Sequence, residues 1–184
     1  MRSIRIITQA RNQPIEIQIA STFVAMETIK ELIINKNLEK IRPFKDNTKA
    51  KSIIAELKKI IVDTNDVEFN DKTIVLSKIE NLNSIGNNDS FKIAFKLMGI
   101  NLTSEDVKCI SMRNRFLHGN SPHEDEPEEV RIQELTKIQL NAHLLTCALI
   151  LKYVGYKGVI KNMLKYLDII NERRELKQEL FRTI

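Results

Sequence analysis

The amino-acid sequence predicts a mostly α-helical protein. Only five glycines and four prolines interrupt its 184 residues, and long stretches are rich in Leu, Ile, Lys and Glu, which favour helices. Apolar residues also recur at intervals of three and four positions, which is the period of a helix with one buried face. With 42% hydrophobic and 29% charged residues, the chain has the composition of a globular protein and is long enough to bury a core.

The N-terminal segment is the exception to this helical pattern. Ile15, Ile17 and Ile19 alternate with polar residues, and residues 12–14, "NQP", suit a turn after the earlier apolar run "IRII". This pattern predicts a short β-hairpin or extended segment. We therefore expect residues 1–20 to form an N-terminal extension and residues 21–184 to form one helical domain.

The remaining elements are all predicted to be helices. Ser21 or Thr22 can cap the first, which ends near Asn37. The apolar spacing predicts further helices over residues 49–62, 71–85, 89–98, 104–118, 130–154 and 160–181. The helix over 104–118 has clear end signals, because Thr103 or Ser104 can cap its start and Gly119 follows its last residue.

Composition argues against several classes of protein. Cys109 and Cys147 are far apart and no histidine has metal-ligand spacing to them, so we expect reduced core cysteines, no metal site and no cofactor. The longest apolar run, residues 144–151, is too short to span a bilayer, and the N-terminus lacks the pattern of a signal peptide. The sequence predicts a soluble cytoplasmic protein without membrane contact.

The charge of the chain favours an anionic partner. Its net charge is +5 with a pI near 9.2, and residues 36–59 hold eight Lys and Arg against three acids. Residues 152–182 hold eight against four, whereas "HEDEPEE", residues 123–129, is strongly acidic. Each of these segments alone also fits a solvated helix face or an exposed acidic loop.

The stretch "SMRNRFLHGN", residues 111–120, stands out because it places two arginines, an asparagine and a histidine at a helix end. On a helical wheel, Asn114 and His118 share an arc with apolar residues, whereas Arg115 falls on the solvated side. Burying an amide and an imidazole without partners costs about 1–3 kcal/mol each, which indicates a cleft, an interface or satisfied neighbours. The alternative is that His118 is a C-cap histidine, favoured by the helix dipole.

These residue types match what RNA cleavage requires. A base must take the proton of the ribose 2′-OH, an acid must protonate the leaving 5′ oxygen, and a cation must stabilise the phosphorane. His118 suits either of the first two roles, Arg113 the third, and Asn114 can orient one of them. His123 and His143 lie in structural or incidental settings, so a second catalytic histidine would come from another copy of the chain.

The residues "RNRFLH", 113–118, resemble the R-x4-6-H signature of the HEPN superfamily (higher eukaryotes and prokaryotes nucleotide-binding), in the form with a polar residue after the arginine. Gly119, the preceding "LMGI" and the later "LILKYVGYKG" are similar to Apea-like HEPN domains of bacterial proteins. The resemblance covers about residues 22–160.

The resemblance implies an antiparallel HEPN-like helical bundle that forms a homodimer with a composite, metal-independent endoribonuclease site. Arg113 and His118 would be catalytic and Asn114 supporting, while Arg115 is our own candidate for contacting the RNA backbone. Many relatives are toxins or abortive-infection effectors against phage. Because only about twenty residues precede the first expected bundle helix, in place of a large N-terminal domain, we expect an antitoxin or a sensor protein as a partner.

Two other functions remain open at the level of sequence. One is a non-catalytic dimer of the same type that binds RNA, a nucleotide or a partner protein. The other is a helical scaffold whose basic faces only keep it soluble, which predicts a monomer indifferent to RNA.

Overall fold

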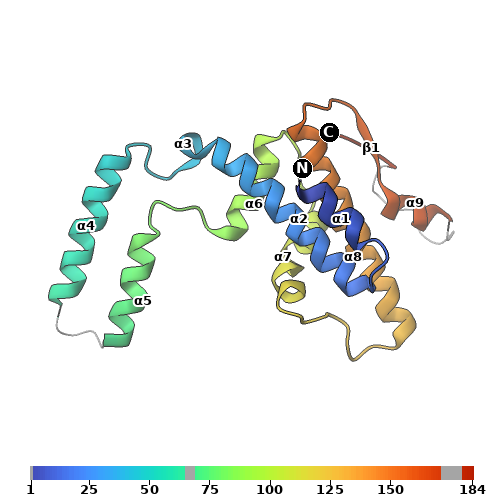
Figure 1. The fold of residues 1–184 in the computed structure, drawn as a ribbon, viewed down its shortest axis with the longest axis horizontal. Helices are drawn as coiled ribbons and strands as arrows, with labels where there is room; N and C mark the ends of the chain where they lie inside the picture. Colours follow the sequence, from blue (N-terminus) through green and yellow to red (C-terminus); the bar gives the residue numbers. More distant parts are fainter. Residues whose placement is uncertain (1, 65–68, 171–179) are drawn as a thin grey trace. The chain divides into compact units, whose positions relative to one another are not determined.

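The computed structural model describes residues 2–64, 69–170 and 180–184, and most of them are helical, as the sequence predicts (Figure 1). The chain divides into two compact units. The larger unit consists of Met1–Ile33 and Phe91–Ile184, and the smaller unit, Ile34–Ser90, is inserted between these two segments. The expected boundary between residues 20 and 21 falls inside a helix of the larger unit.

The N-terminal segment is helical, so the predicted β-hairpin or extended segment is wrong. Helix α1 spans Arg2–Ala10 and α2 spans Ile15–Lys36, with the predicted turn between them. The alternation that suggested a strand is not a pattern of burial, because Ile17 is 48% exposed while Ile19 is fully buried. Ile19 instead begins a helical stripe that continues through Phe23, Met26 and Ile33.

The core of the larger unit lies between α2 and three later helices. These are α6 (Asn87–Leu97), α7 (Ser104–Leu117) and α8 (Glu128–Tyr153). The bounds of each agree with those of a predicted helix to within a few residues. The rings of Phe23 on α2 and Phe116 on α7 lie 6.0 Å apart, and α8 buries Ala142, Leu145 and Leu149 completely. None of the helices among the described residues has the length and apolar character needed to cross a membrane.

The smaller unit contains α3 (Leu38–Ile41), α4 (Asn47–Asp63) and α5 (Phe69–Glu80). Asp46 caps α4 by accepting hydrogen bonds from the backbone N–H groups of Thr48 and Lys49, at 2.9 and 3.0 Å. The apolar spacing that predicts this helix includes Ile60, yet the exposed fraction of Ile60 is 60%. This unit therefore buries less of its apolar stripe than the sequence predicts.

The C-terminal part departs from the single helix predicted over residues 160–181. Strand β1 (Val159–Lys161) pairs antiparallel with β2 (Phe181–Thr183), with Ile160 opposite Arg182, and the shorter helix α9 (Met163–Ile170) follows β1. Asn162 marks the transition, because its side-chain oxygen accepts a hydrogen bond from the backbone N–H of Lys165. Residues 171–179 of the predicted helix lie outside the described residues.

Candidate functional site

The helix that carries the motif, α7, begins with a capping box. The side chain of Thr103 accepts from the backbone N–H of Asp106 at 3.2 Å, and the Asp106 carboxylate accepts from the Thr103 N–H at 2.8 Å. Asp106 is also 2.9 Å from Nη1 of Arg182 on β2. The start of α7 is therefore fixed both locally and to the C-terminal strand.

The end of α7 is fixed by a glycine cap. Gly119 has φ +75°, its N–H donates to Phe116, and the N–H of Asn120 donates to Arg115 at 2.8 Å. These two bonds form a Schellman motif, which only a residue tolerant of positive φ completes without strain. His118 is thereby held as the C-cap residue, and it is exposed. His118 therefore occupies the C-cap position that the sequence also allowed for it.

Arg113 is buried at the centre of the motif. Its exposed fraction is 2%, its Nε lies 3.3 Å from Oε1 of Glu27 on α2, and its guanidinium carbon lies 4.7 Å from the ring centre of Phe91 on α6. Nε and Nη2 both donate to Oδ1 of Asn114, at 3.2 and 2.7 Å. The remaining nitrogen, Nη1, is buried without a hydrogen-bond partner among the described residues.

Asn114 and His118, which the wheel groups with apolar residues, do not lie on the buried face of α7. The buried residues are Asp106, Cys109, Ile110, Arg113 and Phe116, whereas Asn114 and His118 are exposed. Arg115 is exposed, as predicted. Arg113 can lie on the buried face because its guanidinium contacts a carboxylate and an aromatic ring on two other helices.

Sequence reasoning missed three residues of this cluster: Glu27, Lys30 and Phe91. Lys30 is 6% exposed, and its ammonium lies 4.8 Å from the centre of the same Phe91 ring that contacts Arg113. Burial lowers the pKa of Lys30 and the charge of Arg113 lowers it further, whereas Glu27 and Glu31 raise it. One sequence signal was available, since Lys30 follows Met26 by four positions on the buried stripe of α2.

The other two histidines occupy the settings that the sequence predicts. His123 lies in the acidic loop, where its Nδ1 is 3.0 Å from Glu126, and α8 begins at Glu128, inside the segment expected to be loop. His143 lies on α8, where its Nε2 is 3.5 Å from Sγ of Cys147, and burial lowers its pKa. Neither has a contact with the motif among the interactions of the described residues.

Both cysteines are free thiols. Burial raises the pKa of Cys109 to about 12, with a smaller contribution from the charge of Asp106, and burial also raises the pKa of Cys147. Neither thiol is therefore activated as a nucleophile. No group of three or more potential ligands among the described residues could hold a metal ion.

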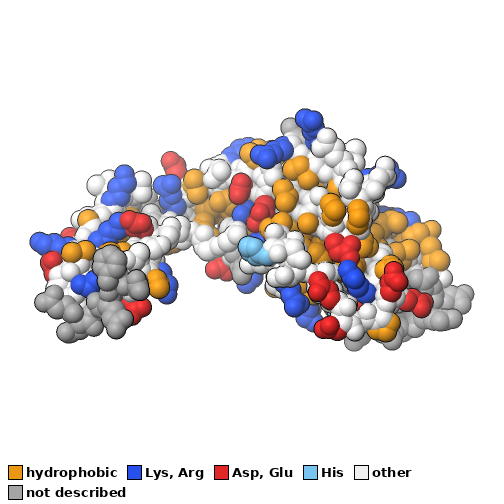
Figure 2. All heavy atoms as spheres, turned by 60° about the horizontal axis from the view of Figure 1, so that its bottom comes forward, with side chains coloured by type: hydrophobic (Ala, Val, Ile, Leu, Met, Phe, Trp, Pro, Cys, Tyr) orange, Lys and Arg blue, Asp and Glu red, His pale blue; other side chains and the backbone are white. Residues whose placement is uncertain are grey.

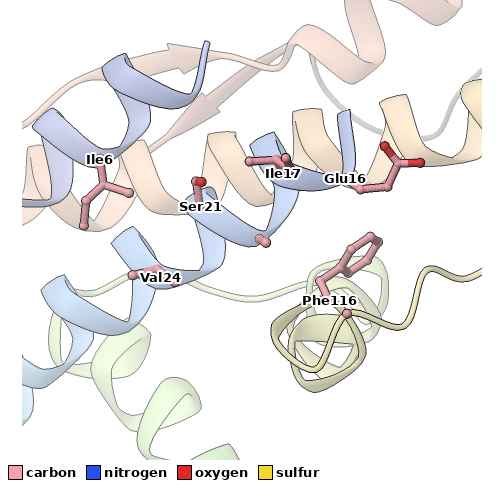
Figure 3. A pocket seen from close by; sticks show the side chains of 8 residues that line it. Ile6, Glu16, Ile17, Ser21, Val24 and Phe116 are labelled. Carbon is pink, nitrogen blue, oxygen red and sulfur yellow. The ribbon is translucent and has the colours of Figure 1, made fainter. Parts of the chain in front are cut away.

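An apolar cavity of about 320 Å³ lies beside the end of α7 (Figure 3). It is lined by residues of α1 and α2 together with the end of the motif helix: Ile6, Glu16, Ile17, Ala20, Ser21, Val24, Phe116 and Gly119. The charge of Glu16 is compensated by Arg131, 2.5 Å away. Figure 2 shows hydrophobic side chains gathered on one face of the larger unit, bordered by acidic and basic groups.

The arrangement offers two polar side chains to a ligand at one end of α7. Asn114 and His118 are one turn apart and exposed, and Arg115 is exposed between them in sequence. An amide and an imidazole at this spacing can donate hydrogen bonds to one anion, and imidazole is the side chain used most often as a general acid or base.

Comparison of the chain with protein-family models, with curated proteins and with solved structures gave no match.

Proposed function

We propose that this protein is a metal-independent endoribonuclease that acts as a homodimer, with one composite site built from two copies of residues 113–118. The observation that carries the proposal is the exposed pair Asn114 and His118, one turn apart at a rigidly capped helix end. The resemblance of "RNRFLH" to the HEPN signature supports it, as does the net charge of +5.

The proposed reaction is transesterification within the RNA chain. One histidine takes the proton of the 2′-OH, the 2′ oxygen attacks phosphorus, and the bond from phosphorus to the 5′ oxygen breaks. A second histidine gives a proton to that leaving oxygen, so the products are a 2′,3′-cyclic phosphate and a 5′-hydroxyl. The Arg113–Asn114 pair stabilises the negative charge that develops on the phosphorane.

The need for two histidines is the reason for a dimer. His118 is exposed, whereas His123 pairs with Glu126 and His143 lies within α8, so one chain supplies one suitable imidazole. The second would be His118 of the other copy across a twofold axis. We propose single-stranded or looped RNA as the substrate, with Arg115 contacting its backbone.

The cellular role that follows from the resemblance is a cytoplasmic toxin or antiphage, abortive-infection effector. A protein of this kind requires control, so the proposed partners are RNA, a second copy of the chain, and an antitoxin or sensor protein.

Cleavage of end-labelled RNA in the presence of EDTA tests this proposal. The wild type should cut, His118→Ala should lose at least about 100-fold of the rate, as expected for loss of a general acid or base, and His123→Ala should keep the wild-type rate. Mass spectrometry of the products should find the cyclic phosphate. Equal cleavage by wild type and His118→Ala would remove His118 from the site.

A second candidate, a non-catalytic dimer that binds RNA, a nucleotide or a partner protein, is favoured by the burial of Arg113. A guanidinium that is 2% exposed is held as part of the fold rather than offered to solvent. This candidate predicts salt-dependent RNA binding by wild type without any cleavage, and no growth arrest when the wild type is expressed.

A further inference from the structure

The hydrogen bonds of Arg113 determine which atoms of the motif face solvent. A guanidinium has donors and no acceptor, so the Asn114 atom that lies 2.7 Å from Nη2 and 3.2 Å from Nε is the amide oxygen Oδ1. With Oδ1 held by Arg113, Nδ2 occupies the other tip of the planar amide. No acceptor for Nδ2 is found within residues 2–64, 69–170 and 180–184, and Asn114 is exposed, so its N–H donors are available to a ligand.

Arg113 itself is poorly placed to contact a phosphate. Its side chain is 2% exposed, its Nε faces Glu27 at 3.3 Å, and the Phe91 ring covers one side of the guanidinium at 4.7 Å. An RNA phosphate could reach this group only if it left both partners and Asn114. Glu27 and Phe91 belong to α2 and α6, so that movement would separate α7 from two helices of the core.

We infer that Arg113 is a positioning residue and that Asn114 is the member of this pair that contacts the scissile phosphate. The inference rests on the proposed function, and it exchanges the roles that the resemblance gives to the two residues. Glu27 and Phe91 fix the guanidinium, the guanidinium fixes Oδ1, and Nδ2 donates to a non-bridging phosphate oxygen beside His118. The positively charged guanidinium that donates to Oδ1 polarises the Asn114 amide and makes its Nδ2–H a stronger hydrogen-bond donor.

A double-mutant cycle on full-length protein tests this inference, with kcat and KM measured for RNA cleavage in EDTA. Asn114→Ala should lower kcat by about 100- to 1,000-fold, the usual effect of removing one donor to a developing oxyanion. Arg113→Lys cannot donate two bonds in fork geometry and should lower kcat by roughly 10- to 100-fold, with KM little changed. In the Asn114→Ala background, Arg113→Lys should change kcat by no more than about twofold, because Arg113 acts through Asn114.

Glu27→Gln provides a gentler version of the same test, since it keeps the shape of the side chain and removes only its charge. It should lower kcat in the wild-type background and not in the Asn114→Ala background. Glu134→Gln and Arg131→Lys are matched controls, because both alter ion pairs of α8 with partners outside the motif. Neither control should change kcat.

A measurement without RNA separates this inference from the proposed function. In protein labelled with 15N at asparagine, the Asn114 side-chain amide should be ordered in wild type and mobile in Arg113→Lys and Glu27→Gln. If wild type does not cut RNA but its Asn114 amide is ordered in this way, the nuclease proposal fails and the positioning by Arg113 stands. An Asn114 amide equally mobile in all three proteins overturns the inference, as does an Arg113→Lys effect on kcat that is the same with and without Asn114.

Discussion

At the scale of single residues, Arg113 combines a structural and a site role in one side chain. Removing one partner of a fully buried ion pair costs about 3–5 kcal/mol, because the other charge remains without compensation. The cost here is smaller, since the side chain of Glu27 is 27% exposed and water can reach it. A loss of activity in Arg113→Ala would therefore mix unfolding with chemistry, which is why the coupling between Arg113 and Asn114 is the informative quantity.

His143 is expected to make the stability of the protein fall in mild acid. Burial lowers its pKa below the value of 6.5 that it has in the unfolded chain. Between pH 6.5 and the folded value, the unfolded chain therefore binds more protons, so the free energy of unfolding decreases as the pH falls through this window. Thermal unfolding at pH 7.5 and 5.5 should show a smaller difference for His143→Gln than for wild type.

His123, the histidine in the acidic loop, supplies the control for this experiment. His123→Gln also removes an imidazole, but from an ion pair with Glu126 whose side chains are 28% and 44% exposed, rather than from the apolar helix α8. If His143→Gln retained the full acid sensitivity of the wild type, desolvation of this imidazole would not be its cause.

At the scale of elements, the capping box makes Thr103 a determinant of where α7 begins. Thr103→Ala removes the acceptor for the Asp106 N–H and should lower the free energy of unfolding by about 1 kcal/mol. Urea denaturation followed by circular dichroism measures this. Thr28→Ala is the matched control, because Thr28 lies inside α2, where its hydroxyl donates to the carbonyl of Val24 one turn earlier. The control should change stability by less than about 0.5 kcal/mol.

The ends of α6 and α7 were predictable from sequence because their signals are local. Gly99 and Gly119 both have positive φ and both close Schellman motifs, and Thr103 accepts from a residue three positions away. Each of these features depends on the backbone within one turn. Asn114 and His118 were predicted as site residues in the same way, from their spacing within one helix end, and the structure exposes both.

The features that sequence did not predict depend on distant partners. The alternation of Ile15, Ile17 and Ile19 with polar residues fits a strand when it is considered locally. A helix forms instead because it packs Ile19 in the core. Strand β1 forms because residues 181–183, about twenty positions later in the chain, pair with it. Arg113 becomes a core residue because Glu27 and Phe91 approach it from two other helices, which a wheel of α7 alone cannot represent.

At the scale of the whole molecule, Arg182 links the C-terminal strand to the first turn of α7. Its Nη1 lies 2.9 Å from the buried Asp106 carboxylate, and its Nη2 donates to the carbonyl of Asn101. Arg182→Ala removes the cation paired with that buried carboxylate, which then keeps the hydrogen bond from the Thr103 N–H, and should lower the free energy of unfolding by about 3 kcal/mol. Guanidinium chloride denaturation measures the change.

An exposed ion pair provides the comparison for Arg182. Lys137 and Glu134 pair on the surface of α8, with side chains 51% and 37% exposed, so Lys137→Ala should cost less than about 1 kcal/mol. Similar effects for the two variants would contradict a special role of the C-terminal strand in holding α7.

The insertion of residues 34–90 between the two segments of the larger unit also sets an order for folding during synthesis. At roughly 5–20 residues per second, a ribosome needs about 3–11 s to make those residues. In the later part of that time α2 lies outside the ribosome, while α7, whose Phe116 packs beside Phe23, has not yet been made. Phe91, which packs beside Lys30, is the first residue of the second segment. Nascent α2 therefore carries an uncovered apolar stripe for several seconds, and the newly made chain depends on α6, α7 and α8 following before that stripe meets another chain.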